Sequence, residues 1–379
     1  MRFRELFDEN MFPIWDKIYA LDCFNVMKET KQSAEWHKEG NVANHTERVV
    51  KEMKKILDGR QCDVDSEDYL VLMSAALCHD LGKPSTTRFD QEKQDYTCKS
   101  HGFAGEKIVR KLFFEDDFWL REKVCWLVRN HMAPFYLKNE NGEYDADKIK
   151  RLSIGPVTLD FLLTLNWADA LGSINDHETS SDIVKRLNET CVFAINNCDN
   201  CIEKPYKYKR CEKLNLYSGL PEVIEQSTPE FTVYIMIGLP GAGKDTWIQN
   251  NIPNVPMLCR DVIRTEIGIE GEKPFGTEEQ ENEVTRILAE RLIDCCRNKR
   301  TCVVNNTNIM KMRRNEIRNL IMPYNPKIVY VYVEAPTVKD CKERRDGQIS
   351  PKVIKRMLNS FEMPESWEYD ELIVYKQKS

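Results

Sequence analysis

The 379-residue chain has no long apolar run, no excess of positive charge and no repetitive tract. A membrane-spanning helix needs roughly 20 consecutive apolar residues, and no stretch approaches that length. Residues 1–8 lack the apolar centre of a signal peptide. The net charge of −6 excludes attraction of nucleic acid by the overall field, so such binding would have to come from local patches. We therefore expect a cytoplasmic protein that does not contact a membrane.

The cysteines lack the regular spacing of a disulfide framework. There are 14 of them, scattered along the chain, and Cys295 and Cys296 are adjacent. Irregular cysteines in a long chain without a signal peptide are typical of reduced thiols. Cys198, Cys201 and Cys211 form a candidate zinc site. No histidine or second close cysteine pair completes it, so the favoured interpretation is that zinc does not bind there.

The first half of the sequence has helical periodicity and no run of alternating strand residues. Apolar residues recur about every 3.6 positions in residues 41–57, 66–78, 103–114, 118–131 and 157–171. The segment at 66–78 begins with Ser66, which is a suitable N-cap. We therefore predict an all-α domain over residues 1–195.

From Phe231 onward, the sequence changes to strands that alternate with helical stretches. Residues 231–237, 301–304 and 328–333 are rich in β-branched and apolar side chains. Strands separated by helices are typical of a parallel sheet with helices on both faces. The sequence therefore predicts a second domain of the α/β class over residues 231–379.

Residues 196–230 are predicted to link the two domains because they contain turn-forming residues that include Pro205, Pro221 and Pro229. A basic and aromatic stretch lies within this segment at residues 204–210. Tyrosine stacking and phosphate contacts would let this stretch touch nucleic acid. A solvated linker is the favoured interpretation.

Histidine is rare in this chain, yet four of the six histidines fall into one ordered series with two aspartates. The series consists of His45, the adjacent pair His79 and Asp80, His101, His131 and Asp169. Imidazole nitrogen and carboxylate oxygen together suit divalent transition metals. Metal ions held in this way activate water at neutral pH and hold a phosphate for attack. Because the ligands come from separate predicted helices, we expect a helical bundle to direct them to one centre.

This order of ligands, H…HD…H…H…D, resembles the HD phosphohydrolase superfamily over about residues 35–175. The resemblance implies two divalent transition-metal ions of the Mn, Ni, Co or Zn class. It places Asp80 between the two ions and assigns His101 and His131 to the second ion. It also implies hydrolysis of phosphate esters by a metal-activated water.

Two further residues near this series have an expected place in the site. Lys83 follows His79 by four residues and is positioned to contact a substrate phosphate, with a solvent-exposed lysine as the alternative. His37 precedes His45 by eight residues and is expected to be structural or to contact a metal ligand without binding the ion itself.

A glycine-rich turn follows the first predicted strand of the second half. Its sequence is Gly238-Leu-Pro-Gly241-Ala-Gly243-Lys244-Asp245-Thr246, which has the spacing of a P-loop. Backbone N–H groups of such a loop hold phosphates, and Lys244 reaches the terminal phosphates of a nucleoside triphosphate. Asp245 stands where a Ser or Thr usually binds Mg²⁺, and its carboxylate is a suitable Mg²⁺ ligand. Thr246 can still donate to a phosphate. We expect ATP, or another NTP, and Mg²⁺ as cofactors.

Three further segments narrow the class of the second half. Asp261 and Arg264 lie where a second strand is expected to end, and residues 305–308 read Asn-Asn-Thr-Asn after the strand that ends at Val304. Residues 339–356 carry seven Lys or Arg against three Asp or Glu. Together these features resemble the polynucleotide kinase branch of P-loop phosphotransferases, which has an arginine-bearing lid.

This resemblance implies a role for each residue. Asp261 would be the general base on an acceptor 5′-hydroxyl, with a helix N-cap as the alternative. Arg264 would bind the acceptor's 3′ phosphate, and Asn306 would contact the substrate. Either Arg344 or Arg345, between which the sequence does not choose, would stabilise charge on the transferring phosphoryl group.

The two halves in this order resemble the bifunctional HD-domain polynucleotide kinases. The resemblance implies repair of nucleic-acid ends, with RNA favoured as the substrate. An NTP-dependent kinase would act on a 5′-OH, and a metal-dependent phosphohydrolase would remove a 2′-phosphate or open a 2′,3′-cyclic phosphate. One alternative is a small-molecule or nucleotide kinase fused to a nucleotidase, and another is a regulator whose first half only binds a nucleotide. The oligomeric state, a homodimer included, stays open.

Overall fold

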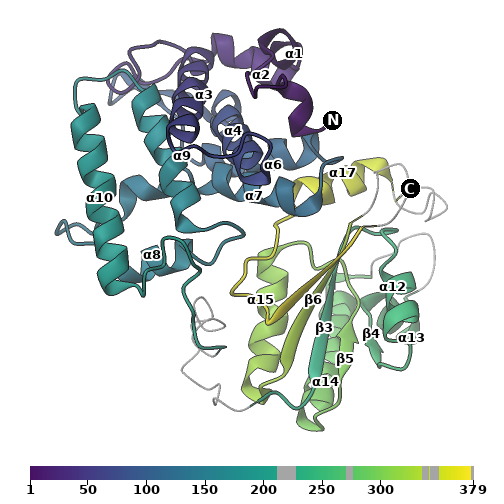
Figure 1. Ribbon diagram of the computed structural model, residues 1–379. Coiled ribbons are helices and arrows are strands. Elements are labelled where there is room, and N and C mark those ends of the chain that lie inside the picture. Colours follow the sequence, from purple (N-terminus) through teal and green to yellow (C-terminus); the bar gives the residue numbers. More distant parts are fainter. Residues whose placement is uncertain (211–227, 270–275, 335–340, 342–349, 377–379) are drawn as a thin grey trace. The chain divides into compact units, whose positions relative to one another are not determined.

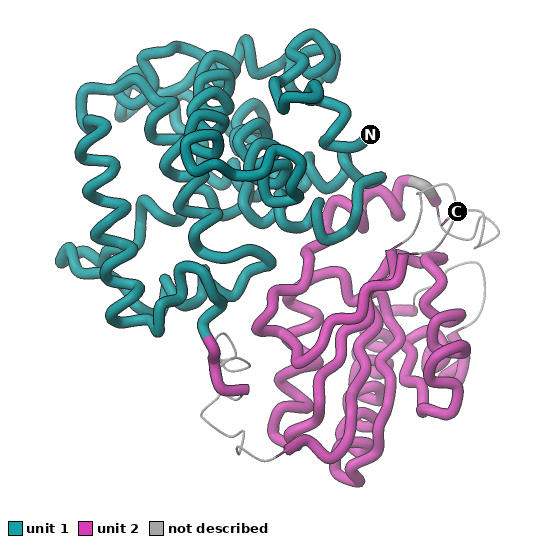
Figure 2. The backbone as a smooth tube through the Cα atoms, in the orientation of Figure 1, with its two compact units in different colours: residues 1–206 teal, residues 207–379 magenta. Residues whose placement is uncertain are grey.

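The computed structural model describes residues 1–210, 228–269, 276–334, 341 and 350–376 (Figure 1). The chain divides into two compact units, residues 1–206 and residues 207–379 (Figure 2). The point of division lies inside the segment 196–230 that the sequence assigns to a linker. Within the described ranges, every helix is too short or too polar to cross a membrane.

The first unit is helical, which confirms the predicted fold class. Its helices are α1 (Trp15–Tyr19), α2 (Asp22–Asn25), α3 (Val42–Gly59), α4 (Glu67–Cys78), α5 (Lys83–Thr86), α6 (His101–Leu112), α7 (Phe118–Asn130), α8 (Ala146–Leu152), α9 (Leu159–Gly172) and α10 (Ser180–Asn197), together with the 3₁₀ turns η1 (Phe3–Leu6), η2 (Val26–Glu29) and η3 (Ala133–Tyr136). A small antiparallel hairpin, β1 (Arg88–Asp90) with β2 (Asp95–Thr97), is an addition that the sequence did not predict. Strands of three residues are too short to show a clear alternating pattern.

Side-chain caps determine where two of the ligand-bearing helices begin. Asn41 accepts a hydrogen bond from the backbone N–H of Asn44 at 2.8 Å, and α3 starts at the next residue. Ser66 accepts from the N–H of Tyr69 at 3.2 Å, as expected for the predicted cap of α4. Helix α3 then packs against both α4 and α9 through its buried apolar face. This packing brings three ligand-bearing segments side by side.

The second unit contains a five-stranded parallel sheet, as the sequence predicted. Its strand order is β4 (Met257–Leu258), β5 (Cys302–Val304), β3 (Thr232–Ile237), β6 (Lys327–Glu334) and β7 (Glu371–Lys376). Strand β3 is central, and its Ile235 pairs with Val304 on one side and with Tyr330 on the other. Ile235 and Met236, whose side chains point to opposite faces of the sheet, are both fully buried. Burial on both faces explains why this strand reads as a continuous apolar run.

Helices connect these strands and cover the sheet. They are α12 (Lys244–Asn251), α13 (Arg260–Glu266), α14 (Glu278–Arg297), α15 (Lys311–Ile321) with the turn η4 (Met322–Tyr324), and α17 (Pro351–Asn359). The crossover through α12 runs in the opposite direction along the sheet from those through α14 and α15. Because such crossovers are right-handed, α12 lies on one face and the other two helices lie on the opposite face (Figure 1). The carboxyl ends of β3, β4 and β5 meet at one edge, where open α/β sheets bind ligands.

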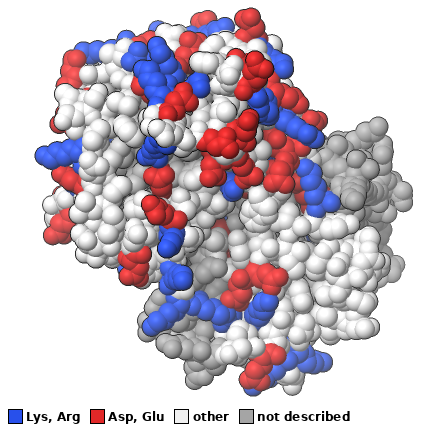
Figure 3. Space-filling model, in the orientation of Figure 1, with Lys and Arg blue, Asp and Glu red and all other residues white. Residues whose placement is uncertain are grey.

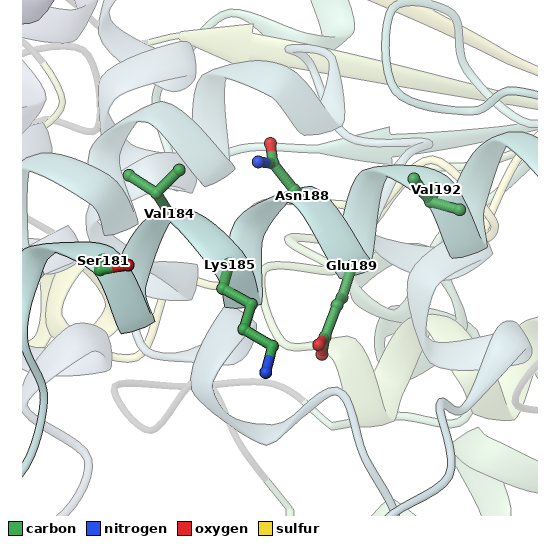
Figure 4. A pocket seen from close by; sticks show the side chains of 6 residues that line it. All are labelled: Ser181, Val184, Lys185, Asn188, Glu189 and Val192. Carbon is green, nitrogen blue, oxygen red and sulfur yellow. The ribbon is translucent and has the colours of Figure 1, made fainter.

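Neither the charge distribution in Figure 3 nor the surface hollow in Figure 4 indicates where a binding site lies. On the face drawn in Figure 3, Lys and Arg side chains are interspersed with Asp and Glu over the described surface. A shallow hollow on α10 is lined by side chains that all extend from this one helix (Figure 4). These side chains are Ser181, Val184, Lys185, Asn188, Glu189 and Val192. None of them belongs to the series of candidate ligands or to the glycine-rich loop.

Candidate metal centre and phosphate-binding loop

The structure brings all six predicted metal ligands together. They are His45 in α3, His79 and Asp80 directly after α4, His101 at the start of α6, His131 directly after α7, and Asp169 in α9. Each of them is buried, with at most 6% of the residue exposed. Helix α6 begins two residues earlier than predicted, so His101 is its first residue.

The six side chains form two adjacent groups of three. In the first group, His45 Nε2 lies 3.0 Å from Asp169 Oδ1, and His79 Nε2 lies 3.7 Å from the same oxygen. In the second group, the Nε2 atoms of His101 and His131 lie 3.0 Å apart. The ligand atoms within each group all lie within 4.8 Å of one another.

Asp80 lies between the two groups and has one oxygen toward each. Its Oδ2 is 3.2 Å from His79 Nε2 and 3.8 Å from His45 Nε2. Its Oδ1 is 3.5 Å from His101 Nε2 and 3.8 Å from His131 Nε2. A carboxylate with its two oxygens divided in this way can bridge two ions.

Three of the ligand histidines are oriented by the backbone in the same manner. The Nδ1 atoms of His79, His101 and His131 each lie 2.8 Å from the carbonyl oxygen three residues earlier in the chain. A carbonyl oxygen can only accept, so Nδ1 carries the proton and Nε2 offers its lone pair to the centre. The rings therefore already have the tautomer that a metal ligand needs.

His45 is oriented differently, by the carboxylate of Glu39. Its Nδ1 lies 2.9 Å from Glu39 Oε1, and His37 Nδ1 lies 2.8 Å from the same oxygen. The other oxygen of Glu39 accepts from the backbone N–H of Ile174 at 2.9 Å. Burial lowers the pKa of His45, but the hydrogen bonds to Asp169 and Glu39 outweigh it and raise that pKa to about 9. Glu39 thus joins His45 to the chain segment that follows Asp169.

Asp80 and His131 are held in the protonation states of metal ligands. Burial tends to raise the pKa of Asp80, but its electrostatic interactions with His79 and Lys83 hold it well below its usual range. Burial and the neighbouring His101 and His79 lower the pKa of His131 to about 3. An ionised carboxylate and a neutral imidazole are the forms that bind divalent ions.

Buried polar atoms without hydrogen bonds show that the centre fits the implied metals. Among the described residues, His79 Nε2 and Asp80 Oδ1 are buried and have no hydrogen-bond partner, whereas Asp80 Oδ2 is paired with the Lys83 ammonium. Native proteins rarely leave such atoms without a partner. Divalent ions between the two groups would satisfy them, and the donor set of imidazole and carboxylate suits transition metals.

Lys83 is buried beside the centre and is not the solvent-exposed lysine of the alternative interpretation. Its ammonium lies 2.7 Å from Asp80 Oδ2 and donates to Gln32 Oε1 at 2.7 Å. A Cβ atom at Gly82 would lie 1.9 Å from the backbone oxygen of His101. Glycine at this position therefore lets the Asp80–Lys83 turn approach the start of α6.

The P-loop runs from the end of β3 to the start of α12 and depends on glycine. Gly241 and Gly243 have φ angles of +75° and +97°. A Cβ atom at Gly241 would also lie 2.5 Å from the backbone oxygen of Cys341. The positive φ angles and the close approach of Cys341 both favour glycine, so this loop could not follow the same path with larger residues at these positions.

The side chain of Lys244, the first residue of α12, folds back over the preceding P-loop. Its ammonium donates to the carbonyl oxygens of Gly238 and Leu239 at 3.0 and 2.9 Å. The backbone of Gly238 is in turn held by the carbonyl oxygen of Thr307, at 3.0 Å. The segment after β5 therefore supports the loop directly, and the Lys244 ammonium is beside the position where phosphates bind in such loops.

The segment after β5 also contacts the start of α12 and of α13. Asn305 Nδ2 donates to Asp245 Oδ1 at 2.5 Å. Asn306 Oδ1 accepts from the backbone N–H of Arg260 at 3.1 Å, so this predicted substrate-binding side chain is engaged with the protein. Asn308 Nδ2 donates to the carbonyl oxygen of Met236.

Asp261 and Arg264 lie together on α13, and Arg264 is already paired. Arg264 donates to Asp261 Oδ1 at 2.6 Å and forms a two-bond pair with Glu281 in α14, at 2.8 and 2.9 Å. Arg260 donates to the same Glu281 at 3.0 Å. Hydrogen bonding to Arg264 lowers the pKa of Glu281 to about 2. The side chain of Asp261 is 67% exposed and stays accessible to an acceptor.

Sequence reasoning missed Glu39, Gln32, Gly82 and Glu281, none of which belongs to a recognisable spacing. Three predicted residues, Arg344, Arg345 and Cys211, lie outside the described residues. Cys198 and Cys201 are buried, and neither belongs to the candidate metal groups found among the described residues.

Comparison with protein families identifies one domain in each unit. Residues 42–156 match the family model described as HD domain, and residues 233–364 match the model described as AAA domain. The chain therefore contains an N-terminal HD domain followed by a C-terminal P-loop domain of the kinase-like class.

Individual proteins are similar to parts of the chain. A CC-adding tRNA nucleotidyltransferase of Thermus thermophilus is 44% identical over 64 residues, which is 15% of this chain and 14% of that enzyme. A chain in the structure of the Pnkp1/Rnl/Hen1 RNA repair complex is 19% identical, with a TM-score of 0.32 and coverage of 35% of this chain and 45% of that one. A sugar kinase from Janibacter sp. HTCC2649 is 16% identical, with a TM-score of 0.29 and coverage of 38% and 85%.

Proposed function

We propose that this chain repairs nucleic-acid ends, with RNA as the favoured substrate. Its second unit would be a kinase that phosphorylates a 5′-OH, and its first unit would remove a 2′-phosphate or open a 2′,3′-cyclic phosphate. Both activities together would produce ends suitable for ligation. The single observation that carries the proposal furthest is the arrangement of Asp80, which has one oxygen toward each group of histidines and Lys83 against it.

In the first unit, the six ligands would hold two divalent transition-metal ions, which when bound supply Lewis-acid activation of water and neutralise charge on the phosphate. Lys83 would bind a phosphate oxygen of the substrate and exchange part of its ion pair with Asp80 for that contact. The backbone carbonyls behind His79, His101 and His131 would keep these rings in one tautomer throughout.

In the second unit, the P-loop N–H groups would hold ATP phosphates, and Lys244 would turn from its carbonyl partners to the terminal phosphates. Asp261 would accept the proton of the 5′-OH while the hydroxyl oxygen attacks the terminal phosphorus and ADP leaves. Arg264 holds the Asp261 carboxylate in place, and a role in binding the acceptor's 3′ phosphate would require it to exchange one of its present partners. The positive charge of Arg344 or Arg345 would stabilise the negative charge on the transferring phosphoryl group. Asn306 would act mainly by holding the backbone at the start of α13.

The choice of RNA rests on the resemblance described above. Its support from comparison is that a short segment of the chain is similar to part of a tRNA nucleotidyltransferase. The decisive experiment uses an RNA oligonucleotide with a 5′-OH and a 2′-phosphate, incubated with ATP and with Mg²⁺ or Mn²⁺. Mapping of both ends should find a new 5′-phosphate and loss of the 2′-phosphate. Modification of neither end, together with activity on free nucleosides or nucleotides, would favour the alternative of a small-molecule kinase fused to a nucleotidase.

A further inference from the structure

Two side chains meet beside the phosphate-binding loop in an unusual combination. Asp245 is the second residue of α12, and Asn305 directly follows β5, whose Val304 pairs with the central strand. Asn305 Nδ2 donates to Asp245 Oδ1. These two positions therefore form one contact at the carboxyl edge of the sheet.

The orientation of the Asn305 amide follows from this contact. An ionised carboxylate only accepts hydrogen bonds, so the amide must present its nitrogen to Asp245. The amide oxygen then lies on the other branch of the same planar group. That oxygen is buried and has no hydrogen-bond partner among the described residues, and only 5% of Asn305 is exposed. A buried carbonyl oxygen without a protein partner, beside a carboxylate, has the chemistry of a cation ligand.

The charges at these two positions are exchanged relative to the usual arrangement. P-loop NTPases generally hold Mg²⁺ with a neutral hydroxyl on the loop and a carboxylate at the end of another strand. Here the loop position holds the carboxylate of Asp245, and the strand-end position holds the neutral amide of Asn305. One negative charge is present in both arrangements. Carboxylate and amide oxygens are both ordinary ligands of hard cations.

We propose that Asp245 and Asn305 together form the magnesium position of this kinase-like unit, with the carboxylate relocated from the strand end to the loop. The inference rests on the proposed NTP-dependent activity, because the ion is the one that accompanies the nucleotide. A purely structural role, in which Asn305 only holds the first turn of α12, is the alternative that the experiment must exclude.

The test exchanges the two side chains, which are nearly identical in size. Three variants of the full chain are needed: Asp245→Asn, Asn305→Asp and the double exchange. ATP binding is measured by calorimetry without metal and across a Mg²⁺ titration. Loss of the carboxylate in Asp245→Asn should weaken the Mg²⁺ dependence about tenfold, and the double exchange should restore it to within about threefold of the parent.

The metal-free measurements provide an independent readout. Without Mg²⁺, Asp245→Asn should tighten ATP binding because it removes a charge that repels the phosphates, and Asn305→Asp should weaken it. Asn306→Asp is the matched control, since it adds the same carboxylate one residue away. Combined with Asp245→Asn, it should fail to restore the Mg²⁺ dependence.

Additive effects of the two single substitutions, or equal recovery with Asn306→Asp, would overturn the proposal. None of these measurements requires a nucleic-acid acceptor. A chain that shows the restored Mg²⁺ dependence but does not phosphorylate an RNA 5′-OH would refute the proposed function and leave this inference standing. An active RNA kinase with additive effects would refute this inference alone.

Discussion

The two sites of this chain are built from different parts of the polypeptide. The candidate metal centre consists of six side chains spread over residues 45–169, and each comes from a helix or from the turn that follows one. The phosphate-binding loop consists mainly of backbone within residues 238–246, between one strand and one helix. The first site exists only when several helices have packed, whereas the second depends on local backbone conformation.

This difference decides which changes each site can tolerate. In the metal centre, one lost side chain removes a ligand, and the surrounding carbonyls cannot replace it. In the loop, most side chains are replaceable, but the glycines, Lys244 and the proposed magnesium ligand Asp245 are not. Substitutions in each site and removal of metal can test this contrast.

The two activities should be separable by single substitutions. Lys244→Ala should lower kinase activity by roughly three orders of magnitude and leave phosphohydrolase activity intact, because Lys244 is the loop's charged group on the phosphates. Asp80→Ala should do the reverse, since it removes the carboxylate shared by both histidine groups. Both variants are assayed for both activities on labelled substrates, with circular dichroism to verify folding. Loss of both activities in a folded single variant would contradict independent sites.

Removal of transition metals should also inactivate the phosphohydrolase of the first unit and leave the kinase of the second unit active. We expect two bound ions per chain, because the six ligands form two groups of three. A chelator selective for transition metals should lower phosphohydrolase activity about a hundredfold or more, while the kinase, assayed with Mg²⁺, keeps its rate. Metal analysis and anomalous scattering provide the count. One occupied position, with His101 and His131 free at saturating metal, would show that the second group is not a metal site.

Glu39 allows a finer test of how side chains build the centre. Glu39→Gln should weaken metal binding about 10- to 100-fold, because His45 loses the carboxylate that holds its Nδ1 proton. The loss should fall on the group that contains His45 and Asp169, since Glu39 contacts neither His101 nor His131 in the described structure. Metal affinity is measured by titration with Co²⁺ or Mn²⁺. Glu35→Gln, at an exposed carboxylate four residues earlier, is the control. Equal weakening by both variants would mean that Glu39 contributes only charge.

The sequence predicts the ligands of the metal centre better than it predicts their support. Histidine is rare here, so an ordered series of His45, His79, Asp80, His101 and His131 stands out without any knowledge of packing. The partners behind the ligands are carbonyl groups and Glu39, which look like any other backbone or surface carboxylate in a sequence. Their roles arise only when separate helices meet, so spacing along the chain carries no signal for them.

The same contrast applies to the second unit. The spacing of Gly241, Gly243 and Lys244 predicts the loop because all of its parts are neighbours in the sequence. The partner of Arg264 could not be predicted, because Glu281 belongs to a helix that the sequence does not connect with α13. The fold class was predictable throughout, since helical periodicity and buried apolar strands are local patterns. The short hairpin β1–β2 was not, because strands of three residues show no clear period.

The mildest test of this contrast uses two glycines with positive φ angles, one near each site. Gly241 in the loop has φ of +75°, and Gly40, five residues before His45, has φ of +100°. An alanine in a left-handed backbone conformation costs about 1–2 kcal/mol at either position. A Cβ atom at Gly40 would meet nothing within 4 Å, whereas one at Gly241 would meet the backbone oxygen of Cys341.

Gly241→Ala should therefore lower ATP affinity about tenfold or more, because the loop must move away from Cys341 and its N–H groups lose their alignment. Gly40→Ala should cost stability alone and leave metal affinity unchanged, since the ligands around His45 are side chains that keep their partners. Urea denaturation reports the stability of each variant, and calorimetry reports ATP and metal affinity. If Gly40→Ala weakened metal binding as strongly as Gly241→Ala weakens ATP binding, the metal centre would depend on local backbone as much as the loop does. The contrast between a side-chain site and a backbone site would then be wrong.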